Sequence, residues 1–232
     1  MAIKLITISP YETGETKDWI FEKAEEEIGF LNMLKDSPNV VNILNSEVKD
    51  SSVAIVLELC TTSLEKWMMQ AFSRPEPVVT NHPSLSTFVP FLSSTIKQLR
   101  SKEIVHFDLY PGNILLCGNV WKVTDFDKAE IVPRRGRLPV SPRGAYGFTD
   151  PSILESGGIA TSKTDLYSVG AILYTLLERG DRVDLARRPW TFAHMVMMRG
   201  PMGKFIEKLV KKKFKKISNF YHEAERIFPN PT

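Results

Sequence analysis

The first third of the chain alternates short apolar runs with one amphipathic stretch, a pattern typical of a small sheet packed against a helix. Residues 2–8 and 52–60 are rich in β-branched residues and predict strands, and residues 39–44 predict a third. Because residues 52–60 are almost continuously apolar, we expect this strand at the centre of the sheet. Residues 16–35 carry an apolar stripe at helical spacing and predict a helix.

Helical periodicity dominates the rest of the chain. It predicts helices at residues 63–71, 85–102, 162–178 and 202–222, with a Pro- and Ser-rich loop after the first. Two short strands, 113–117 and 120–126, are expected to flank a turn, and residues 127–148 predict a long polar loop. This order predicts an α+β fold in which a small lobe, residues 1–61, precedes a mostly helical lobe, residues 62–232.

The composition narrows the class of protein. Of 232 residues, 43% are hydrophobic and 25% are charged, which excludes collagen-like and broadly disordered chains. The N-terminal apolar run is too short for a signal peptide, and no apolar stretch approaches the length of a transmembrane helix. Cys60 and Cys117 are too few for a disulfide framework or a zinc site, which favours a reducing compartment. We therefore expect a cytoplasmic, intracellular protein.

The net charge of +3 is unevenly distributed. Residues 201–232 contain eight Lys and Arg against three Glu, a balance of +5, so the first 200 residues sum to −2. Within this segment, residues 204–221 place apolar side chains near one face and lysines around the rest. Such a helix could touch anionic lipid or nucleic acid, but it more often packs on its own domain. We therefore expect neither a nucleic-acid partner nor an integral membrane contact.

Two neighbouring segments carry the candidate chemistry, IVHFDLYPGNILL at 104–116 and VTDFDKAEI at 123–131. Asp108 lies five residues before Asn113, and Asp125 follows twelve residues later, each beside a predicted strand. Two carboxylates and an amide oxygen suit Mg²⁺, which prefers oxygen ligands shared with phosphates. One carboxylate left off the metal could orient a hydroxyl nucleophile. A single triplet such as HFD or DFD often has no role beyond forming a loop, but the spacing of the two together favours a metal and phosphate site.

These segments resemble the eukaryotic protein kinase family, and the resemblance spans about residues 2–178. Residues 104–116 are similar to the catalytic loop H-R-D-L-x-x-x-N, and TDFD stands where D-F-G is expected. Residues 144–152 resemble the end of the activation segment, and KTDLYSVGAILYTLL resembles the buried central helix, with Asp165 as its anchoring aspartate. The resemblance implies a protein-kinase-like bilobal fold, whose reduced N-terminal lobe holds a short antiparallel sheet and a C-helix.

The resemblance also implies a site for ATP and Mg²⁺. Asp108 would act as the catalytic residue that accepts the proton of the substrate hydroxyl. Asn113 and Asp125 would hold Mg²⁺ on the ATP phosphates. Lys4 would contact the α- and β-phosphates and pair with Glu27.

Further residues complete this implied site. Glu58, Cys60 and Leu115 would lie at the ATP site, with the backbone of the first two facing adenine. Glu27 has independent support, because it lies on the apolar stripe of the predicted helix, where a carboxylate is costly to bury unless a cation meets it. The alternative is that Glu27 reaches solvent at the edge of the stripe.

Several positions depart from the family pattern. Only three residues precede Lys4, so the glycine-rich hairpin that covers the phosphates is absent from this sequence, and no G-x-G-x-x-G occurs elsewhere. The other departures are Phe107 for arginine, Tyr110 for a phosphate-contacting lysine, Asp127 for glycine, Ala145 for threonine, and Ser152 for a glutamate that Glu155 could replace.

Three functions stay open at this point. The first is a Ser/Thr protein kinase that transfers the ATP γ-phosphate to a protein hydroxyl and manages with a reduced N-lobe, although the missing hairpin could impair its activity. The second is a catalytically weak mimic, or pseudokinase, that binds and regulates a true kinase or its substrate. The third is a small-molecule phosphotransferase, because HFDLYPGN and DFD also resemble the aminoglycoside and choline phosphotransferases. A fragment of a longer kinase would give the same pattern.

The N-terminal strand suggests one kind of partner, beside a protein substrate or a partner kinase. Residues 2–8 are apolar and β-branched, and Lys4 is their only charge. With the hairpin absent, we expect one edge of this strand to be open to strand addition by a partner. The alternative is that residues 9–18 fold back over the edge.

Overall fold

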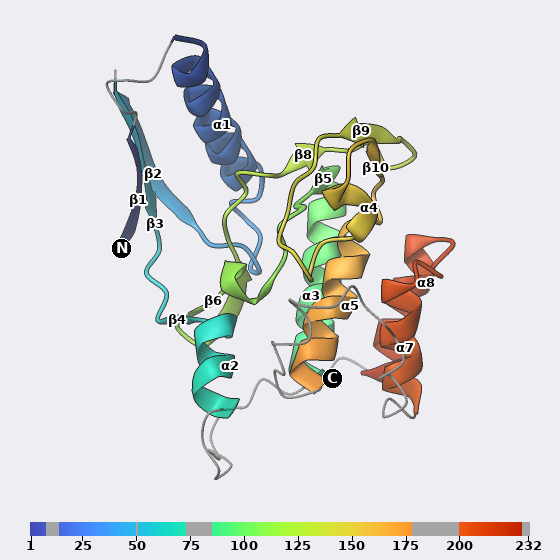
Figure 1. The fold of residues 1–232 in the computed structure, drawn as a ribbon. Helices are drawn as coiled ribbons and strands as arrows, with labels where there is room; N and C mark the ends of the chain where they lie inside the picture. Colours follow the sequence, from blue (N-terminus) through green and yellow to red (C-terminus); the bar gives the residue numbers. More distant parts are fainter. Residues whose placement is uncertain (8–13, 50, 73–84, 178–199, 229–232) are drawn as a thin grey trace.

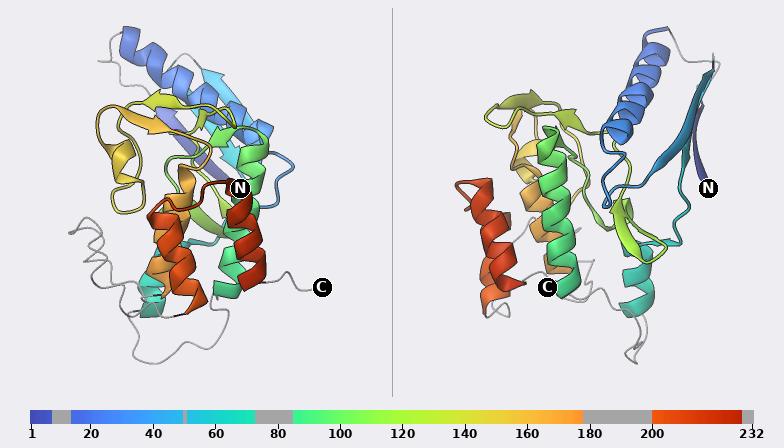
Figure 2. Two further views of the ribbon diagram at one scale, coloured as in Figure 1. Left: turned by 90° about the vertical axis from the view of Figure 1, so that its right-hand side faces the viewer. Right: turned by 180° about the vertical axis from the view of Figure 1, so that it is seen from behind.

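The computed structural model describes residues 1–7, 14–49, 51–72, 85–177 and 200–228, and these form two lobes (Figure 1). The first lobe contains a sheet and one long helix, and the second contains most of the helices (Figure 2). The predicted α+β architecture is therefore confirmed. The predicted loop at 73–84 lies outside the described residues, as do residues 8–13. Of the segment 9–18 considered as a cover for the first strand, residues 14–18 are described and begin the first helix.

The sheet of the first lobe is antiparallel, with the strand order β1-β3-β2. Its strands are β1 Ala2–Thr7, β2 Ile43–Lys49 and β3 Ser52–Leu57. The central position of β3 is as predicted, and it follows from burial on one face, where Val53 and Ile55 are buried. The strand expected at 39–44 begins only at Ile43, because the residues before it turn toward the second lobe. There Val40 forms a single parallel bridge with Val123.

Helix α1, Gly14–Met33, lies alongside this sheet in Figures 1 and 2. Its buried stripe includes Ala24, Phe30 and Leu31, which belong to the same hydrophobic core as the buried residues of β3. Glu27 lies on this stripe and is only 2% exposed, so the alternative that it reaches solvent is wrong. The helix predicted at 16–35 is thus confirmed with slightly earlier ends.

The second lobe contains the other helices of the described residues (Figure 1). They are α2 Leu64–Phe72, α3 Leu85–Ser101, α4 Pro151–Leu154, α5 Asp165–Leu177, α7 Pro201–Val210 and α8 Ile217–Ile227. Helix α5 is almost entirely buried, as its apolar sequence predicts. None of the helices of the described residues is long and apolar enough to cross a membrane.

Short strands connect these helices and carry the candidate site. They are β4 Thr62–Ser63, β5 Ile104–Val105, β6 Ile114–Cys117, β7 Val120–Val123, β8 Glu130–Ile131, β9 Leu138–Val140 and β10 Gly158–Ala160. β6 and β7 form the predicted hairpin around Gly118, which adopts a positive φ of 62°. The loop predicted at 127–148 is not wholly irregular, because β8 pairs with β5 and β9 pairs with β10.

The basic segment at 202–222 is not one helix. It is divided into α7 and α8 by residues 211–216, where Lys212 adopts a positive φ of 53° and Phe214 turns into the core. Phe205, Phe214 and Phe220 contact one another in that core. The apolar face of the segment is thus buried, which confirms that it packs on its own domain.

A disulfide bond joins Cys60 to Cys117. From the sequence, the two cysteines were judged too few for a disulfide framework, and a bond between them was not predicted. They meet because Thr61 donates its N–H to the carbonyl oxygen of Leu116 at 2.8 Å, and β4 then pairs with β6. The segment between the lobes is therefore tied covalently to the β6–β7 hairpin.

Gly170 in α5 marks the closest approach of two helices. A Cβ at this position would lie 2.8 Å from atoms of both Leu209 and Val210 in α7. Gly29 in α1, by contrast, has no atom within 4 Å of such a Cβ. In Gly170→Ala, overpacking should lower the free energy of unfolding by about 1–3 kcal/mol, while helix propensity should raise it by about 1 kcal/mol. We expect overpacking to dominate, so that the variant is less stable than the wild type.

The matched substitution Gly29→Ala makes the same chemical change without the clash. It should raise the free energy of unfolding by about 0.5–1 kcal/mol. Urea unfolding followed by circular dichroism measures both. Two substitutions that shift stability in the same direction would contradict the proposed helix contact.

Candidate active site

Asp165, at the start of α5, anchors the loop that carries Asp108. The Asp165 carboxylate accepts hydrogen bonds from the backbone N–H groups of His106 at 2.8 Å and Phe107 at 3.0 Å. Burial raises the pKa of Asp165, while its contacts with His106 and Phe107 oppose that rise. The role of Asp165 as an anchor of the catalytic loop follows from these two bonds.

Two residues of the site adopt left-handed backbone conformations. Phe107 has a φ of 64° and Asp125 a φ of 66°, which are unfavourable for residues with a Cβ and occur where surrounding structure holds them. Phe107 is held by a buried side chain and by Thr149, whose hydroxyl donates to its carbonyl oxygen at 3.1 Å. The guanidinium of Arg143 lies 5.3 Å from the centre of the Phe107 ring. An apolar residue therefore fills the position where the resemblance to protein kinases implies arginine.

Asp108 is buried, with 4% of its surface exposed, and it has two neighbours from different segments. Lys128 donates to Asp108 Oδ2 at 2.7 Å. Asn113 Nδ2 donates to the Asp108 carbonyl oxygen at 3.1 Å and approaches Oδ2 at 3.4 Å. Asp108 Oδ1 has no hydrogen-bond partner among the described residues. The structure thus brings Asp108 and Asn113 together as predicted, and it adds Lys128.

Lys4 lies between two carboxylates. Its Nζ contacts Glu27 Oε2 at 2.8 Å and Oε1 at 2.9 Å, and Asp125 Oδ1 at 2.6 Å. Burial raises the pKa of Glu27, and the Lys4 charge only partly offsets this. Burial lowers the pKa of Lys4, but Glu27 and Asp125 outweigh it, so the pKa of Lys4 is raised and the ammonium stays charged. The pair expected between Lys4 and Glu27 is present, with Asp125 as a second partner.

The carboxylates of Asp108, Asp125 and Asp127 form an acidic cluster. Each offers an oxygen that lies within 4.8 Å of the others. Burial, followed by the charge of Asp125, raises the pKa of Asp127. These oxygen donors and the unpartnered Asp108 Oδ1 fit Mg²⁺, a hard cation with oxygen ligands. From the sequence, Asp127 was noted only as a replacement for glycine, although its carboxylate two residues after Asp125 was a usable signal.

The residues expected around adenine lie where the two lobes connect. The Glu58 carboxylate accepts from the N–H of Asn42 at 2.7 Å and from Lys122 Nζ at 2.6 Å. The Glu58 N–H donates to the Asn42 carbonyl oxygen at 3.0 Å. Cys60 follows in the same segment, and Leu115 is half-buried in the adjacent strand β6. The three residues are therefore gathered at one end of the lobe junction.

A cavity of about 650 Å³ opens beside the acidic cluster. Lys4, Glu27, Asp127 and Lys128 are among the residues that line it, and so is Trp19 of α1. Its size lies in the range of small-molecule sites.

The segment at 144–152, which resembles the end of a kinase activation segment, is held by an ion pair that the sequence did not reveal. Asp150 Oδ2 contacts Lys212 Nζ at 2.5 Å, and Lys212 also donates to the Ser152 hydroxyl at 3.0 Å. Asp150 additionally caps α4, because its Oδ1 accepts from the Ser152 N–H at 3.0 Å. Glu155 was considered as the substitute for the missing glutamate, whereas Asp150 makes the ion pair.

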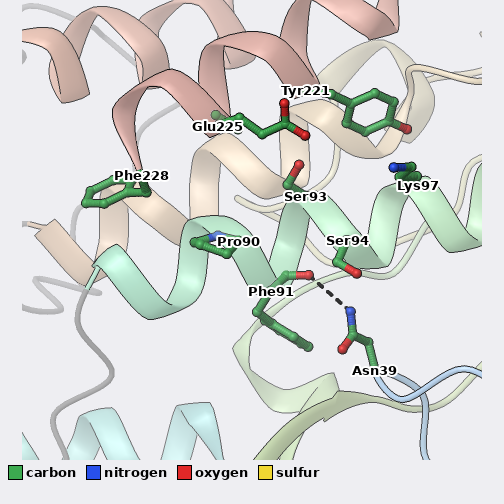
Figure 3. A pocket seen from close by; sticks show the side chains of 10 residues that line it. Asn39, Pro90, Phe91, Ser93, Ser94, Lys97, Tyr221, Glu225 and Phe228 are labelled. Atoms are coloured by element: carbon green, nitrogen blue, oxygen red, sulfur yellow. Dashed lines mark hydrogen bonds between the residues drawn. The ribbon is translucent and has the colours of Figure 1, made fainter. Parts of the chain in front are cut away.

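A second cavity, of about 360 Å³, lies between α3 and α8 (Figure 3). At its edge Asn39 donates to the Phe91 carbonyl oxygen at 3.4 Å. Tyr221 projects from α8, and burial raises its pKa to about 12. None of the candidate site residues lines this cavity, so it is separate from the acidic cluster.

The bilobal fold, the anchored Asp108 loop and the Lys4 ion pairs together define the phosphotransferase class to which protein kinases belong. Comparison with known families agrees, because the protein kinase domain matches residues 1–226. The chain belongs to the protein kinase family.

Similar curated proteins are serine/threonine-protein kinases. They include atg1 of Dictyostelium discoideum, 30% identical over 183 residues that cover 76% of this chain and 26% of that protein. Nek5 of Homo sapiens is 27% identical over 157 residues, covering 67% of this chain and 22% of that protein. The cell cycle kinase CDC5/MSD2 of Saccharomyces cerevisiae is 28% identical over 142 residues, covering 60% and 19%. The matches therefore span about a quarter or less of these relatives.

Removing the Lys4 ammonium should destabilise the fold in a pH-dependent way. Lys4→Met leaves the Glu27 carboxylate buried without its cation, and we expect a loss of about 2 kcal/mol near neutral pH, less than for fully buried pairs because Lys4 is partly exposed. A folded-state pKa above the usual 4.5 means that stability falls as pH rises from 4.5 toward the raised pKa. Losing Lys4 removes the charge that lowers this pKa, so the variant should lose more stability than the wild type as pH rises above the usual value of 4.5 toward neutral.

The control is the double variant Lys4→Met/Glu27→Gln, which removes the titrating group. Urea unfolding across this pH range should show the added pH dependence disappear in the double variant. If the free energy of unfolding of the double variant kept the added pH dependence, another group would be its cause.

Proposed function

We propose that this chain is a Mg²⁺-dependent Ser/Thr protein kinase that transfers the γ-phosphate of ATP to a protein hydroxyl. The observation that carries this proposal is the position of Lys4, whose ammonium joins Glu27 to Asp125 beside the Asp108 loop. This arrangement fits the phosphate-binding half of a phosphoryl-transfer site. Family membership supports the same reading.

Each residue has a role in this mechanism. Asp108 orients the substrate hydroxyl and accepts its proton. Lys4 binds the α- and β-phosphates while Glu27 holds the lysine in place. Asn113 and Asp125 hold Mg²⁺, with Asp127 in reach of the same ion. When bound, Mg²⁺ supplies charge neutralisation on the phosphates.

The proposal places adenine at the segment that connects the two lobes. The backbone of Glu58 and Cys60 binds adenine, and Leu115 packs beneath its ring. Support comes from the bonds that fix Glu58 to Asn42 and Lys122 and from the disulfide that fixes Cys60 to β6. These contacts leave little freedom in the segment that connects the lobes.

A catalytically weak mimic is the second candidate. The observation that favours it is the contact of Lys128 with Asp108, which engages the residue that a working kinase uses as base. Such a protein binds and regulates another kinase or its substrate without transferring phosphate.

Nucleotide binding distinguishes these candidates from an empty fold. With Mg-ATP at about 100 times its dissociation constant, we expect a stabilisation of about 2.7 kcal/mol. For a domain of this size that corresponds to a rise of about 5–10 °C in melting temperature. Asp125→Asn should abolish most of the rise, because it removes a proposed metal ligand. Differential scanning fluorimetry measures both.

Asp108→Asn separates binding from transfer. It should retain the thermal shift but lose incorporation of labelled phosphate into a generic protein acceptor, because Asp108 acts on the hydroxyl. No shift in the wild type, or an equal shift in Asp125→Asn, contradicts nucleotide binding at this site. Binding without transfer in the wild type supports the mimic, and transfer only to aminoglycosides or choline supports the small-molecule phosphotransferase.

The edge of β1 supports a further proposal about partners. Among the described residues β1 pairs only with β3, so its other edge has no neighbouring strand. Ile3 and Leu5 are 60% and 61% exposed on the outer face of this strand. We propose that a strand from another protein, such as a second copy of this chain or the N-lobe of a partner kinase, pairs with this edge.

Light scattering and hydrogen exchange test this pairing with the second copy. We expect association at high concentration, with the amides of residues 2–7 protected only in the associated form. Leu5→Lys should weaken association, whereas Leu44→Lys, an equally exposed position on β2, should not. A monomer in which the β1 amides are already protected would contradict the proposal.

A further inference from the structure

The cation at the catalytic aspartate comes from the loop that also carries the acidic cluster. Lys128 Nζ donates to Asp108 Oδ2 at 2.7 Å. The backbone of this loop is fixed, because Ala129 donates its N–H to the Phe126 carbonyl oxygen at 3.0 Å and Arg143 donates to the Lys128 carbonyl oxygen at 3.4 Å. The position of Lys128 is therefore determined by the turn and not only by its own ion pair.

The local charge balance favours a second cation beside the proposed Mg²⁺. Asp108, Asp125 and Asp127 bring three carboxylates within 4.8 Å of one another. Among the described residues, two lysines contact this cluster, and Lys4 is already shared between Glu27 and Asp125. A triphosphate bound here adds further negative charge next to Asp108. Lys128 is the lysine placed to meet it on the Asp108 side.

The catalytic loop itself offers no cation at this point. Tyr110, two residues after Asp108, has its ring folded over Gly112, where it leaves no room for a Cβ. Its ring centre lies 6.2 Å from that of Phe148. After burial, the charges of Asp108 and Asp125 raise the pKa of Tyr110, and Lys128 opposes them. Residue 110 and Lys128 therefore lie in the same electrostatic environment, and only Lys128 carries a positive charge.

We propose that Lys128 binds the transferring γ-phosphoryl group, supplying from the loop after β7 the positive charge that the catalytic loop lacks. In this step the substrate hydroxyl oxygen bonds to the γ-phosphorus, and the bond from that phosphorus to the β–γ bridging oxygen breaks. ADP leaves with the electron pair of that bond, and the hydroxyl proton passes to Asp108. Lys128 shifts from Asp108 Oδ2 to an oxygen of the γ-phosphoryl group. There its ammonium neutralises the negative charge of the group during transfer.

The competing reading is that Lys128 blocks Asp108 and keeps the enzyme inactive. The two readings predict opposite changes when the ammonium is removed. A phosphate-binding lysine is needed for ATP binding and transfer, whereas a blocking lysine lowers transfer while present. This inference rests on the proposed kinase function, so its test measures nucleotide affinity as well as transfer.

The experiment compares Lys128→Met with the wild type by calorimetric titration of Mg-ATP and Mg-ADP. Only ATP carries the γ-phosphate, so we expect its dissociation constant to rise about tenfold while that of Mg-ADP changes less than about twofold. The rate of transfer to a protein acceptor should fall about 100-fold or more, because the contact between Lys128 and the γ-phosphoryl group is stronger in the transition state than in bound ATP. Lys128→Arg keeps the charge and should retain the preference for ATP over ADP.

Two controls complete the design. Lys204→Met removes an exposed lysine of α7 and should leave both affinities unchanged. Tyr110→Lys in the Lys128→Met background returns a cation to the same environment and should restore at least part of the ATP preference. A melting temperature within about 2 °C of the wild type shows that Lys128→Met is folded; if it is not, Lys128→Arg against Lys128→Gln serves the same comparison.

The outcomes decide between the readings. Unchanged affinities and transfer, or equal weakening of ATP and ADP, would overturn the role of Lys128 and leave the kinase function intact. Faster transfer in Lys128→Met would establish the blocking reading instead. A wild type that binds neither nucleotide would reject the kinase function and this inference together.

Discussion

The ammonium group of Lys4 lies between two carboxylates that come from separate parts of the chain. Glu27 is 23 residues away on α1, and Asp125 is 121 residues away in the second lobe. Because Glu27 is almost fully buried, α1 can rest on the sheet in this orientation only while a cation meets it. The same ammonium holds the left-handed Asp125 in front of the sheet. The position of α1, the first lobe and the acidic cluster therefore depend on one another.

Features set by local pattern could be read from the sequence. The continuous apolar run at 52–60 placed a strand at the centre of the sheet, and the single acid on an apolar helical stripe identified Glu27 as a buried, paired residue. The spacing of Asp108, Asn113 and Asp125 located the site, because Asn113 and Asp125 adjoin the β6–β7 hairpin that the sequence also predicts. Each of these features follows from the local order of apolar and polar residues, which the sequence shows directly.

Features set by distant contacts could not be read in this way. Seven lysines lie between residues 204 and 221, and nothing in their spacing selects Lys212 as the partner of Asp150. The selection follows from the helix break that turns Phe214 inward, a consequence of packing on the core. The role of Lys128 was hidden for the same reason, since its neighbour Asp108 is 20 residues earlier in sequence. The disulfide likewise depends on how the two lobes meet.

The attachment of the first lobe to the β6–β7 hairpin has a mechanical consequence. Cys60 is bonded to Cys117 near the turn of the hairpin, while residues 39–41 exchange two backbone hydrogen bonds with Val123 at its open end, of 2.8 and 2.9 Å. Two fixed points on a rigid hairpin define an axis. Rotation of one lobe against the other is thereby reduced from three angular freedoms to one, a swing about the length of the hairpin. Such a swing changes the separation of Lys4 from Asp125 directly, while the segment around Glu58, close to the axis, hardly moves.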